Sequence, residues 1–151
     1  MSTVVLSGAT DPLGRRVATA LGRLASVDRV VTLDHADLAS PDLKSRIEGT
    51  GAVVHLNGGV DETHALLDAA GAVGVGHFVL LSSATVYGAW ANNPVPLTED
   101  APLRPNSELE FAVRAAERER LASDWKSEHP TATVAVLRPT VSVSTADVLP
   151  L

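Results

Sequence analysis

The chain of 151 residues contains no cysteine, no long apolar run and no cluster of basic residues. The absence of cysteine excludes disulfides, thiolate chemistry and cysteine-based zinc sites. No segment approaches the roughly 18 consecutive apolar residues that a membrane-spanning helix requires. The N-terminal stretch "MSTVVLSGA" has no basic leader, and its apolar run is too short for a signal peptide. We therefore expect a cytoplasmic protein that does not bind membranes.

Basic and aromatic side chains are also scarce. Twelve Lys and Arg residues are scattered among 18 Asp and Glu residues, and the net charge is −6. Nucleic-acid binding requires clustered Lys and Arg side chains, so we expect no nucleic-acid partner. Aromatic residues make up only 3% of the chain, which disfavours a platform for stacking bases or sugars. The five histidines lack the spacing of metal ligands, so no metal site is predicted.

Strand-like and helical segments alternate along the chain. Short β-branched apolar runs predict strands, and apolar residues at helical spacing predict helices between them. The expected strands are 3–8, 29–34, 52–58, 77–88 (running into a loop) and 133–139, and the expected helices are 12–26, 41–49, 61–74 and 107–128. This alternation predicts an α/β fold with a doubly wound, mostly parallel sheet of about five strands.

The last of these helices has two predicted features. Ser107 and Glu110 have the spacing of a capping box, so the helix is expected to begin at Ser107. The stretch "AERERLASDWKSE" is interpreted as a solvated charged face, with Leu121 and Trp125 turned inward.

Six stretches follow one another in an order that resembles a known family. They are "SGATDPLGRRV", "LDHADL", "AVVHLNGG", "FVLLSSATVYG", "PLTEDAPLRPNS" and "VAVLRPT". Together they resemble the landmarks of the extended short-chain dehydrogenase/reductase family, the NAD-dependent sugar epimerases and dehydratases. The resemblance implies a Rossmann-like NAD(P)-binding-type domain over residues 1–140, with residues 141–151 as a tail or a linker to an absent region. It also implies that the smaller domain, which holds the nucleotide-sugar substrate in the family, is lacking.

The Gly-rich turn departs from the family pattern. Gly8 and Gly14 match the outer positions of the family's Gly-x-x-Gly-x-x-Gly, but Asp11 stands at the middle position, followed by Pro12. Aspartate before proline is a helix-start signature, with aspartate as the N-cap. A carboxylate there would occupy the N–H donors of the helix and repel a diphosphate. We therefore expect a capped helix start in place of a phosphate cradle.

The acidic residues after the second strand also bear on cofactor binding. Asp34 matches the position that holds the adenosine ribose in NAD-preferring members, and Asp37 and Leu38 resemble the family's pair near adenine. Only two residues separate Asp34 from Asp37, so one strand of the usual order is missing and the second strand is expected at a sheet edge. The alternative is that both aspartates are loop residues and helix caps. No cofactor is predicted; if one binds, it is NAD(H), held by Gly8, Gly14, Asp34, Asp37 and Leu38.

Two of the family's three catalytic residues are replaced. The family uses a tyrosine as the acid–base, a lysine one helical turn later and a serine on a neighbouring strand. Ser83 matches the serine, but Phe111 and Ala115 stand at the tyrosine and lysine positions. Glu110 and Arg114 are interpreted as an ordinary i, i+4 ion pair. Catalysis by the family mechanism is therefore not expected.

The leading interpretation is a catalytically inactive Rossmann domain that acts as a regulatory or structural module of a larger protein. The alternatives are a working NAD-dependent epimerase, dehydratase or reductase, and a nucleotide-sensing domain. Expected partners are other domains of a longer polypeptide, or a second copy bound through the helices over 61–74 and 107–124.

Overall fold

The computed structural model describes residues 2–140 and contains one sheet in that range. Its strands are β1 (Ser2–Ser7), β2 (Val27–Leu33), β3 (Thr50–His55), β4 (His77–Leu81) and β5 (Thr133–Leu137). The strand order is β2-β1-β3-β4-β5, and every neighbouring pair is parallel. The predicted α/β class and the five-stranded Rossmann-like sheet are thereby confirmed. The predicted tail, 141–151, lies outside the described residues.

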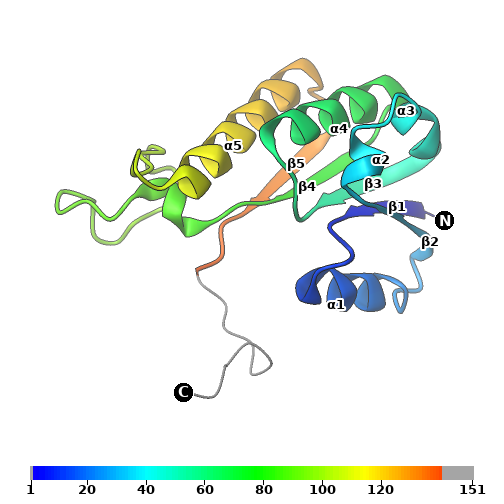
Figure 1. Ribbon diagram of the computed structural model, residues 1–151, viewed down its shortest axis with the longest axis horizontal. Helices are drawn as coiled ribbons and strands as arrows, with labels where there is room; N and C mark the ends of the chain where they lie inside the picture. The colour runs from blue at the N-terminus through cyan, green and yellow to red at the C-terminus, as the bar shows by residue number, and fades with distance from the viewer. Residues whose placement is uncertain (1, 141–151) are drawn as a thin grey trace.

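Helices cover both faces of this sheet (Figure 1). The helical elements are α1 (Pro12–Leu21), α2 (His35–Leu38), α3 (Leu43–Arg46), α4 (Val60–Val73), the 3₁₀ helix η1 (Ala84–Tyr87) and α5 (Glu110–Glu128). Helices α4 and α5 lie side by side on one face, and α1 lies on the other, beneath β1 and β2. The predicted doubly wound arrangement, with helices on both faces of the sheet, is therefore confirmed. Within the described range no helix has the length and apolar character needed to cross a membrane.

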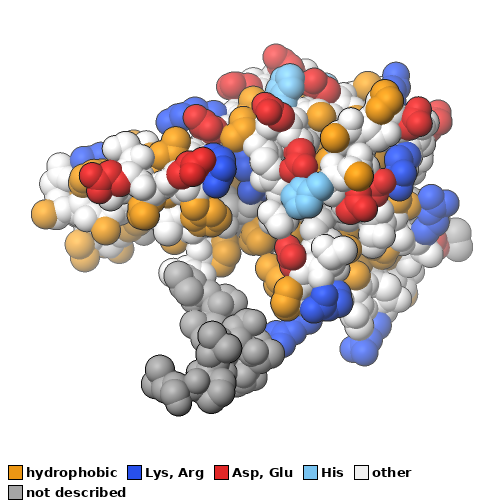
Figure 2. Space-filling model, viewed as in Figure 1, with side chains coloured by type: hydrophobic (Ala, Val, Ile, Leu, Met, Phe, Trp, Pro, Cys, Tyr) orange, Lys and Arg blue, Asp and Glu red, His pale blue; other side chains and the backbone are white. Residues whose placement is uncertain are grey.

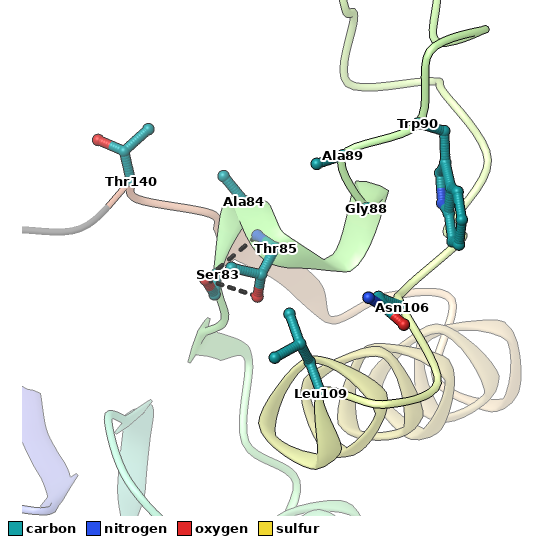
Figure 3. A pocket seen from close by; sticks show the side chains of 9 residues that line it. All are labelled: Ser83, Ala84, Thr85, Gly88, Ala89, Trp90, Asn106, Leu109 and Thr140. Atoms are coloured by element: carbon teal, nitrogen blue, oxygen red, sulfur yellow. Dashed lines mark hydrogen bonds between the residues drawn. The ribbon is translucent and has the colours of Figure 1, made fainter.

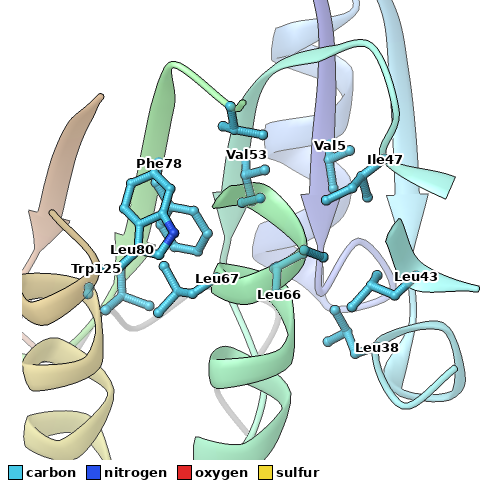
Figure 4. Packing of buried hydrophobic residues seen from close by; sticks show 14 of the residues in the cluster. Val5, Leu38, Leu43, Ile47, Val53, Leu66, Leu67, Phe78, Leu80 and Trp125 are labelled. Carbon is cyan, nitrogen blue, oxygen red and sulfur yellow. The ribbon is translucent and has the colours of Figure 1, made fainter. Parts of the chain in front are cut away.

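The main hydrophobic core lies between the sheet and the α4–α5 layer (Figure 4). Alternate strand residues point to the same face of a sheet, so Val5, Val53 and Phe78 all face this layer. Leu66 of α4 is fully buried against them, and Trp125 of α5 packs on Phe78 with ring centroids 5.8 Å apart. Burying each such side chain contributes about 1.5–3 kcal/mol, so this layer is the main source of stability.

Strand β2 forms one edge of the sheet, as the short connection after Asp34 predicted. Strands β1 and β3 are neighbours at the point where the strand order reverses direction. In open α/β sheets, ligands bind at the carboxyl ends of the strands beside such a point. The loops that follow β1 and β3 are therefore where a binding site is expected.

The structure corrects the predicted start of α5 and part of its predicted charged face, whereas Trp125 is buried and Leu121 packs against the core as predicted. The helix begins at Glu110, and its N-cap residue, Leu109, makes no side-chain cap. The predicted capping box is wrong because Asn106 sets the turn: its Oδ1 accepts a 3.0 Å hydrogen bond from the N–H of Glu108. The charged stretch is also not wholly solvated, since Arg118 and Glu119 are only 8% and 4% exposed. Both lie on the face of α5 that packs against the rest of the domain.

Candidate functional site

The turn after β1 is held tightly against the start of α1. Gly8 has a positive φ of 79°, and Gly14 is buried. A Cβ atom at Gly14 would lie 1.9 Å from the carbonyl oxygen of Gly8, so no larger residue fits without moving the backbone. Both glycines are thus required by the packing of α1 on the turn.

Asp11 occupies the N-cap position of α1, as predicted, but its side chain makes no cap. Its Oδ2 instead accepts a 3.0 Å hydrogen bond from the Nδ2 of Asn57, in the loop after β3. The prediction of a side-chain cap is therefore wrong, because the amide of Asn57 draws the carboxylate across to the neighbouring loop. The negative charge nevertheless remains on the turn that the family uses for phosphates.

Asp34 and Asp37 cap the short helix α2 reciprocally. Asp34 Oδ1 accepts from the N–H of Asp37 at 2.8 Å, and Asp37 Oδ2 accepts from the N–H of Asp34 at 3.0 Å. Asp37 also forms a 2.8 Å ion pair with Arg46. Leu38 is 2% exposed and packs in the main core. The geometry is that of the helix-cap alternative raised from the sequence, with both carboxylates already paired within the chain.

Phe111 and Ala115 line a cavity of about 280 Å³ between the loop after β3 and the start of α5. Phe111 is 62% exposed, whereas Ala115 is buried. The full lining is His35, Asn57, Gly58, Gly59, Phe111, Arg114, Ala115 and Arg118. This cavity, called here the Arg118 cavity, has charged groups of one sign only: it includes two arginines and no carboxylate.

Ser83 lies in a different hollow, of about 350 Å³ (Figure 3). Its Oγ accepts hydrogen bonds from the N–H of Thr85 at 3.2 Å and from Thr85 Oγ1 at 3.0 Å, so it caps η1. Leu109 points toward the serine from the start of α5, and Trp90 stands on the far side of the hollow. Ser83 and the pair Phe111 and Ala115 therefore line two different cavities. Leu109, directly before α5, lines the first, and residues of α5 itself line the second.

A buried polar chain runs behind the Arg118 cavity. His55 is fully buried, with Nδ1 bonded to the hydroxyl of Ser7 and Nε2 at 2.8 Å from Thr63 Oγ1. Thr63 donates to the Gly59 carbonyl at 2.8 Å and accepts from Arg118 Nε at 2.9 Å. Because the threonine proton goes to that carbonyl, His55 donates from Nε2 and accepts at Nδ1. Burial, and then the positive charge of Arg118, lower the pKa of His55 to about 3, so the ring is neutral.

A second buried cluster fixes β5 and η1 to α5. The carboxylate of Glu119 accepts hydrogen bonds from two nitrogens of Arg138, at 2.7 Å to Oε2 and 3.2 Å to Oε1. It also accepts one from the hydroxyl of Ser82. Arg138 also bonds the hydroxyl of Tyr87, and Glu119 raises the pKa of Arg138. Every charged group in this cluster has its partner, which marks it as structural. Within residues 2–140, no group of three or more acidic or histidine side chains is arranged to hold a metal ion.

Three residues of this site were not predicted from the sequence: Arg118, Thr63 and Asn57. Arg118 does carry a signal, because it follows Ala115 by three residues and precedes Ala122 by four, which places it on the buried face of the helix. Thr63 and Asn57 have no comparable signal, since their roles depend on contacts far apart in the chain.

Comparisons with known proteins agree on the fold. Residues 4–146 match the model described as the NAD dependent epimerase/dehydratase family. A short-chain dehydrogenase/reductase superfamily protein from Agrobacterium tumefaciens with bound NAD is 28% identical, with a TM-score of 0.70 over 90% of this chain. An NAD-dependent NDP-hexosamine 5,6-dehydratase is 23% identical, with a TM-score of 0.74 over 91%. A UDP-glucuronic acid 4-epimerase from Bacillus cereus in complex with NAD is 17% identical, also with a TM-score of 0.74 over 91%. No curated protein matches the chain.

The chain spans about half the length of these structures. It covers 48% of the Agrobacterium protein, 54% of the dehydratase and 56% of the epimerase. The likeness therefore concerns one part of each of those proteins.

Proposed function

The chain belongs to the NAD-dependent epimerase/dehydratase family, and we propose that this Rossmann domain is a catalytically inactive member that serves as a regulatory or structural module of a longer protein. Two losses are proposed beyond family membership: the catalytic acid–base residue and the binding of a dinucleotide. Each rests on its own residues.

The observation that carries the proposal is the pair of side chains at the acid–base positions. Phe111 has no ionisable oxygen and Ala115 has no cation, and Ser83 lines a separate cavity. The neighbouring Arg114 pairs with Glu110 at 3.0 Å, as expected from the sequence, and both side chains are largely exposed. A positioned general acid–base typically contributes about 10²–10⁴-fold to the rate. Without the tyrosine and its lysine, no side chain at these positions can perform the proton transfer that the family's mechanism requires.

The residues present do not fit a dinucleotide. The Asp11 carboxylate crosses from the Gly-rich turn to Asn57, where it would face the diphosphate at close range. Asp34, the residue for the adenosine ribose, is engaged in capping α2. Leu38, next to the adenine in the family, is buried in the core. No NAD-dependent reaction is therefore proposed for this chain.

The two matching glycines do not favour the working-enzyme alternative. A Cβ at Gly14 would meet the backbone of Gly8, and Gly8 itself has a positive φ. Both residues are needed for the strand–turn–helix junction whether or not a cofactor binds. Their presence is therefore equally compatible with an inactive domain.

The proposed partners are other domains of a longer polypeptide or a second copy bound through α4 and α5. The exposed side chains of these helices include the pairs His64–Asp68 and Glu110–Arg114. Acidic, basic and histidine side chains are spread over the face of the molecule that carries these helices (Figure 2), so a dimer through this surface would have a polar interface. Sedimentation of the chain at several concentrations tests it, since a mass that stays at that of one chain excludes the dimer.

Thermal unfolding in the presence of millimolar NAD⁺, NADH, NADP⁺ or NADPH tests the loss of the cofactor. We expect no shift with any of the four. A ligand at 100 times its Kd would add about 2.7 kcal/mol and raise the midpoint by several degrees. A clear shift with one of them would overturn the proposal and support a nucleotide-binding or catalytic domain.

The double substitution Phe111→Tyr with Ala115→Lys serves as the companion experiment. If the acid–base were the only missing part, this variant would bind NAD⁺ and reduce it with a sugar substrate. We expect it to fold, because Phe111 is exposed and Ala115 borders a cavity, and to remain inactive. Recovered hydride transfer would show that the cofactor site is intact.

A further inference from the structure

Arg118 is a buried cation without an acidic partner. It is 8% exposed, and its Nε donates to Thr63 Oγ1 at 2.9 Å. Its second terminal nitrogen is buried without a hydrogen-bond partner, and among residues 2–140 it forms no ion pair. Burial lowers the pKa of Arg118, but arginine remains charged in proteins. A buried charge is normally paired, so the missing partner requires an explanation.

The carboxylates nearest to Arg118 are already engaged. Glu62 accepts from the N–H of Gly59 at 2.6 Å and pairs with His35 at 2.8 Å. Glu119 is held by Arg138 and by the hydroxyl of Ser82. Each of these carboxylates therefore offsets the positive charge of Arg118 only from a distance, without an ion pair, and neither lines the Arg118 cavity.

The Arg118 cavity is lined by cationic side chains that an anion could neutralise. Arg118 and Arg114 supply two guanidinium groups to this space. The Asn57 amide also lines it, but because that amide binds the Asp11 carboxylate, only the two arginines are considered as ligands of the anion. The cavity also borders the Gly58–Gly59 turn at the start of α4. A Cβ at Gly58 would lie 2.7 Å from His55 Cε1, so only glycine lets this turn pass so close to the ring.

We propose that the Arg118 cavity binds a phosphate group carried by a small molecule, with Arg118 and Arg114 as its cationic ligands. The inference rests on the proposed loss of the dinucleotide, since the same space then remains for a smaller anion. A volume of about 280 Å³ is just below the range of typical small-molecule sites, which runs from about 300 to 1,000 Å³. It suits one phosphate group with a compact attached moiety.

Charge and donor geometry favour phosphate over carboxylate. A phosphate monoester carries about −1.5 to −2 charges at neutral pH and three acceptor oxygens. The two guanidinium groups match that charge and supply several N–H donors for those oxygens. The exposed Glu110 is the one carboxylate paired with Arg114 in the described range, and such exposed pairs contribute little, so a phosphate can displace it.

Calorimetric titration with inorganic phosphate and with ribose 5-phosphate, at constant ionic strength, tests the proposal. We expect the unmodified chain to bind at least one of them, and Arg118→Met to weaken that binding at least about 10-fold. Methionine keeps the apolar stem and removes the charge. Arg120→Met is the matched control, because Arg120 is exposed on the same helix and outside the cavity, and it should bind as the unmodified chain does. Tighter binding of ribose 5-phosphate than of phosphate identifies the ester as the source.

The proposal is wrong if neither probe binds to the folded chain, or if Arg118→Met binds as well as Arg120→Met does. The unfolding midpoint provides a second readout should Arg118→Met alter stability: phosphate should raise it for the unmodified chain and leave it unchanged for this variant. Binding of NAD⁺ in the same titrations would overturn the proposed function instead, so the two failures are distinguishable.

Discussion

The Oδ2 atom of Asp11 lies 3.0 Å from the Nδ2 atom of Asn57, and this hydrogen bond joins the loop after β1 to the loop after β3. The two strands are neighbours where the strand order reverses, so the contact spans the crevice in which open α/β sheets bind ligands. Under the proposed function, this contact takes the position where the family's dinucleotide places its phosphates.

Replacing Asp11 separates the effect of its charge from that of its contact. Asp11→Gly removes both, and we expect its affinity for NAD⁺ to rise at least about 10-fold, which corresponds to about 1.4 kcal/mol. Asp11→Asn keeps the size and the hydrogen-bonding capacity but removes the charge. Titration calorimetry of both variants with NAD⁺ is the measurement. An equal gain in the two variants would identify repulsion of the diphosphate as the cause.

If neither variant of Asp11 gains affinity, the charge is not what excludes the dinucleotide. The short connection between Asp34 and Asp37 is then the cause, because both carboxylates are committed to capping α2. Asn57→Ala serves as a control for the contact, since it frees the carboxylate without neutralising it and should not restore binding.

Gly14 matches the family's Gly-rich turn, and its substitution tests whether the glycine is required for packing or for binding a cofactor. In Gly14→Ala the new Cβ would lie 1.9 Å from the Gly8 carbonyl oxygen, which forces the backbone to move. We expect a loss of about 2 kcal/mol or more in the free energy of unfolding, measured with urea. Gly22→Ala is the control: Gly22 has helical φ and ψ of −66° and −10°, and its Cβ would be 3.4 Å from the nearest atom. That substitution should cost less than about 0.5 kcal/mol. Equal stability of the two variants would contradict the packing explanation.

The fold could be predicted from the sequence because its signals are local. Four of the five strands in the described residues contain short β-branched runs, β4 is apolar after its first residue, and the longer helices between them have apolar residues at helical spacing. The edge position of β2 followed from the two-residue spacing between Asp34 and Asp37, which leaves no room for a further strand. These features depend on residues that are close together in the chain.

The site was less predictable because its contacts join distant segments. The Asp11 carboxylate was expected to cap its own helix, but Asn57, 46 residues later, binds it instead. Arg118 stands among charged neighbours in the sequence, yet it is buried because Thr63, 55 residues earlier, accepts its Nε proton. Which of several polar side chains faces inward is decided by the element packed against it. The spacing of Arg118 from Ala115 and Ala122 indicates the buried face of α5, but the sequence of α5 alone does not identify Thr63 as the partner of Arg118.

The dependence of stability on pH reports whether the buried ring of His55 is neutral in the folded chain. Its folded pKa of about 3 is below the ordinary value of 6.5, because burial and Arg118 disfavour the charged ring. As the pH falls, the unfolded chain therefore takes up the proton before the folded chain does. Stability from this group is fully present above about pH 6.5 and falls by about 1.4 kcal/mol per pH unit down to about pH 3.

The substitution His55→Gln removes this titration while keeping an amide that can bond Ser7 and Thr63. At pH 7 we expect the variant to be less stable than the unmodified chain, since glutamine fills the site less well. Between pH 7 and pH 5 the unmodified chain should lose about 2 kcal/mol more than the variant, because only its unfolded state gains a proton at residue 55. Urea unfolding at both pH values measures the two differences. If the stability gap between the two proteins is the same at pH 5 as at pH 7, His55 is not held neutral. The assignment of its Nε2 proton to Thr63, on which the polar chain to Arg118 depends, would then have to be abandoned.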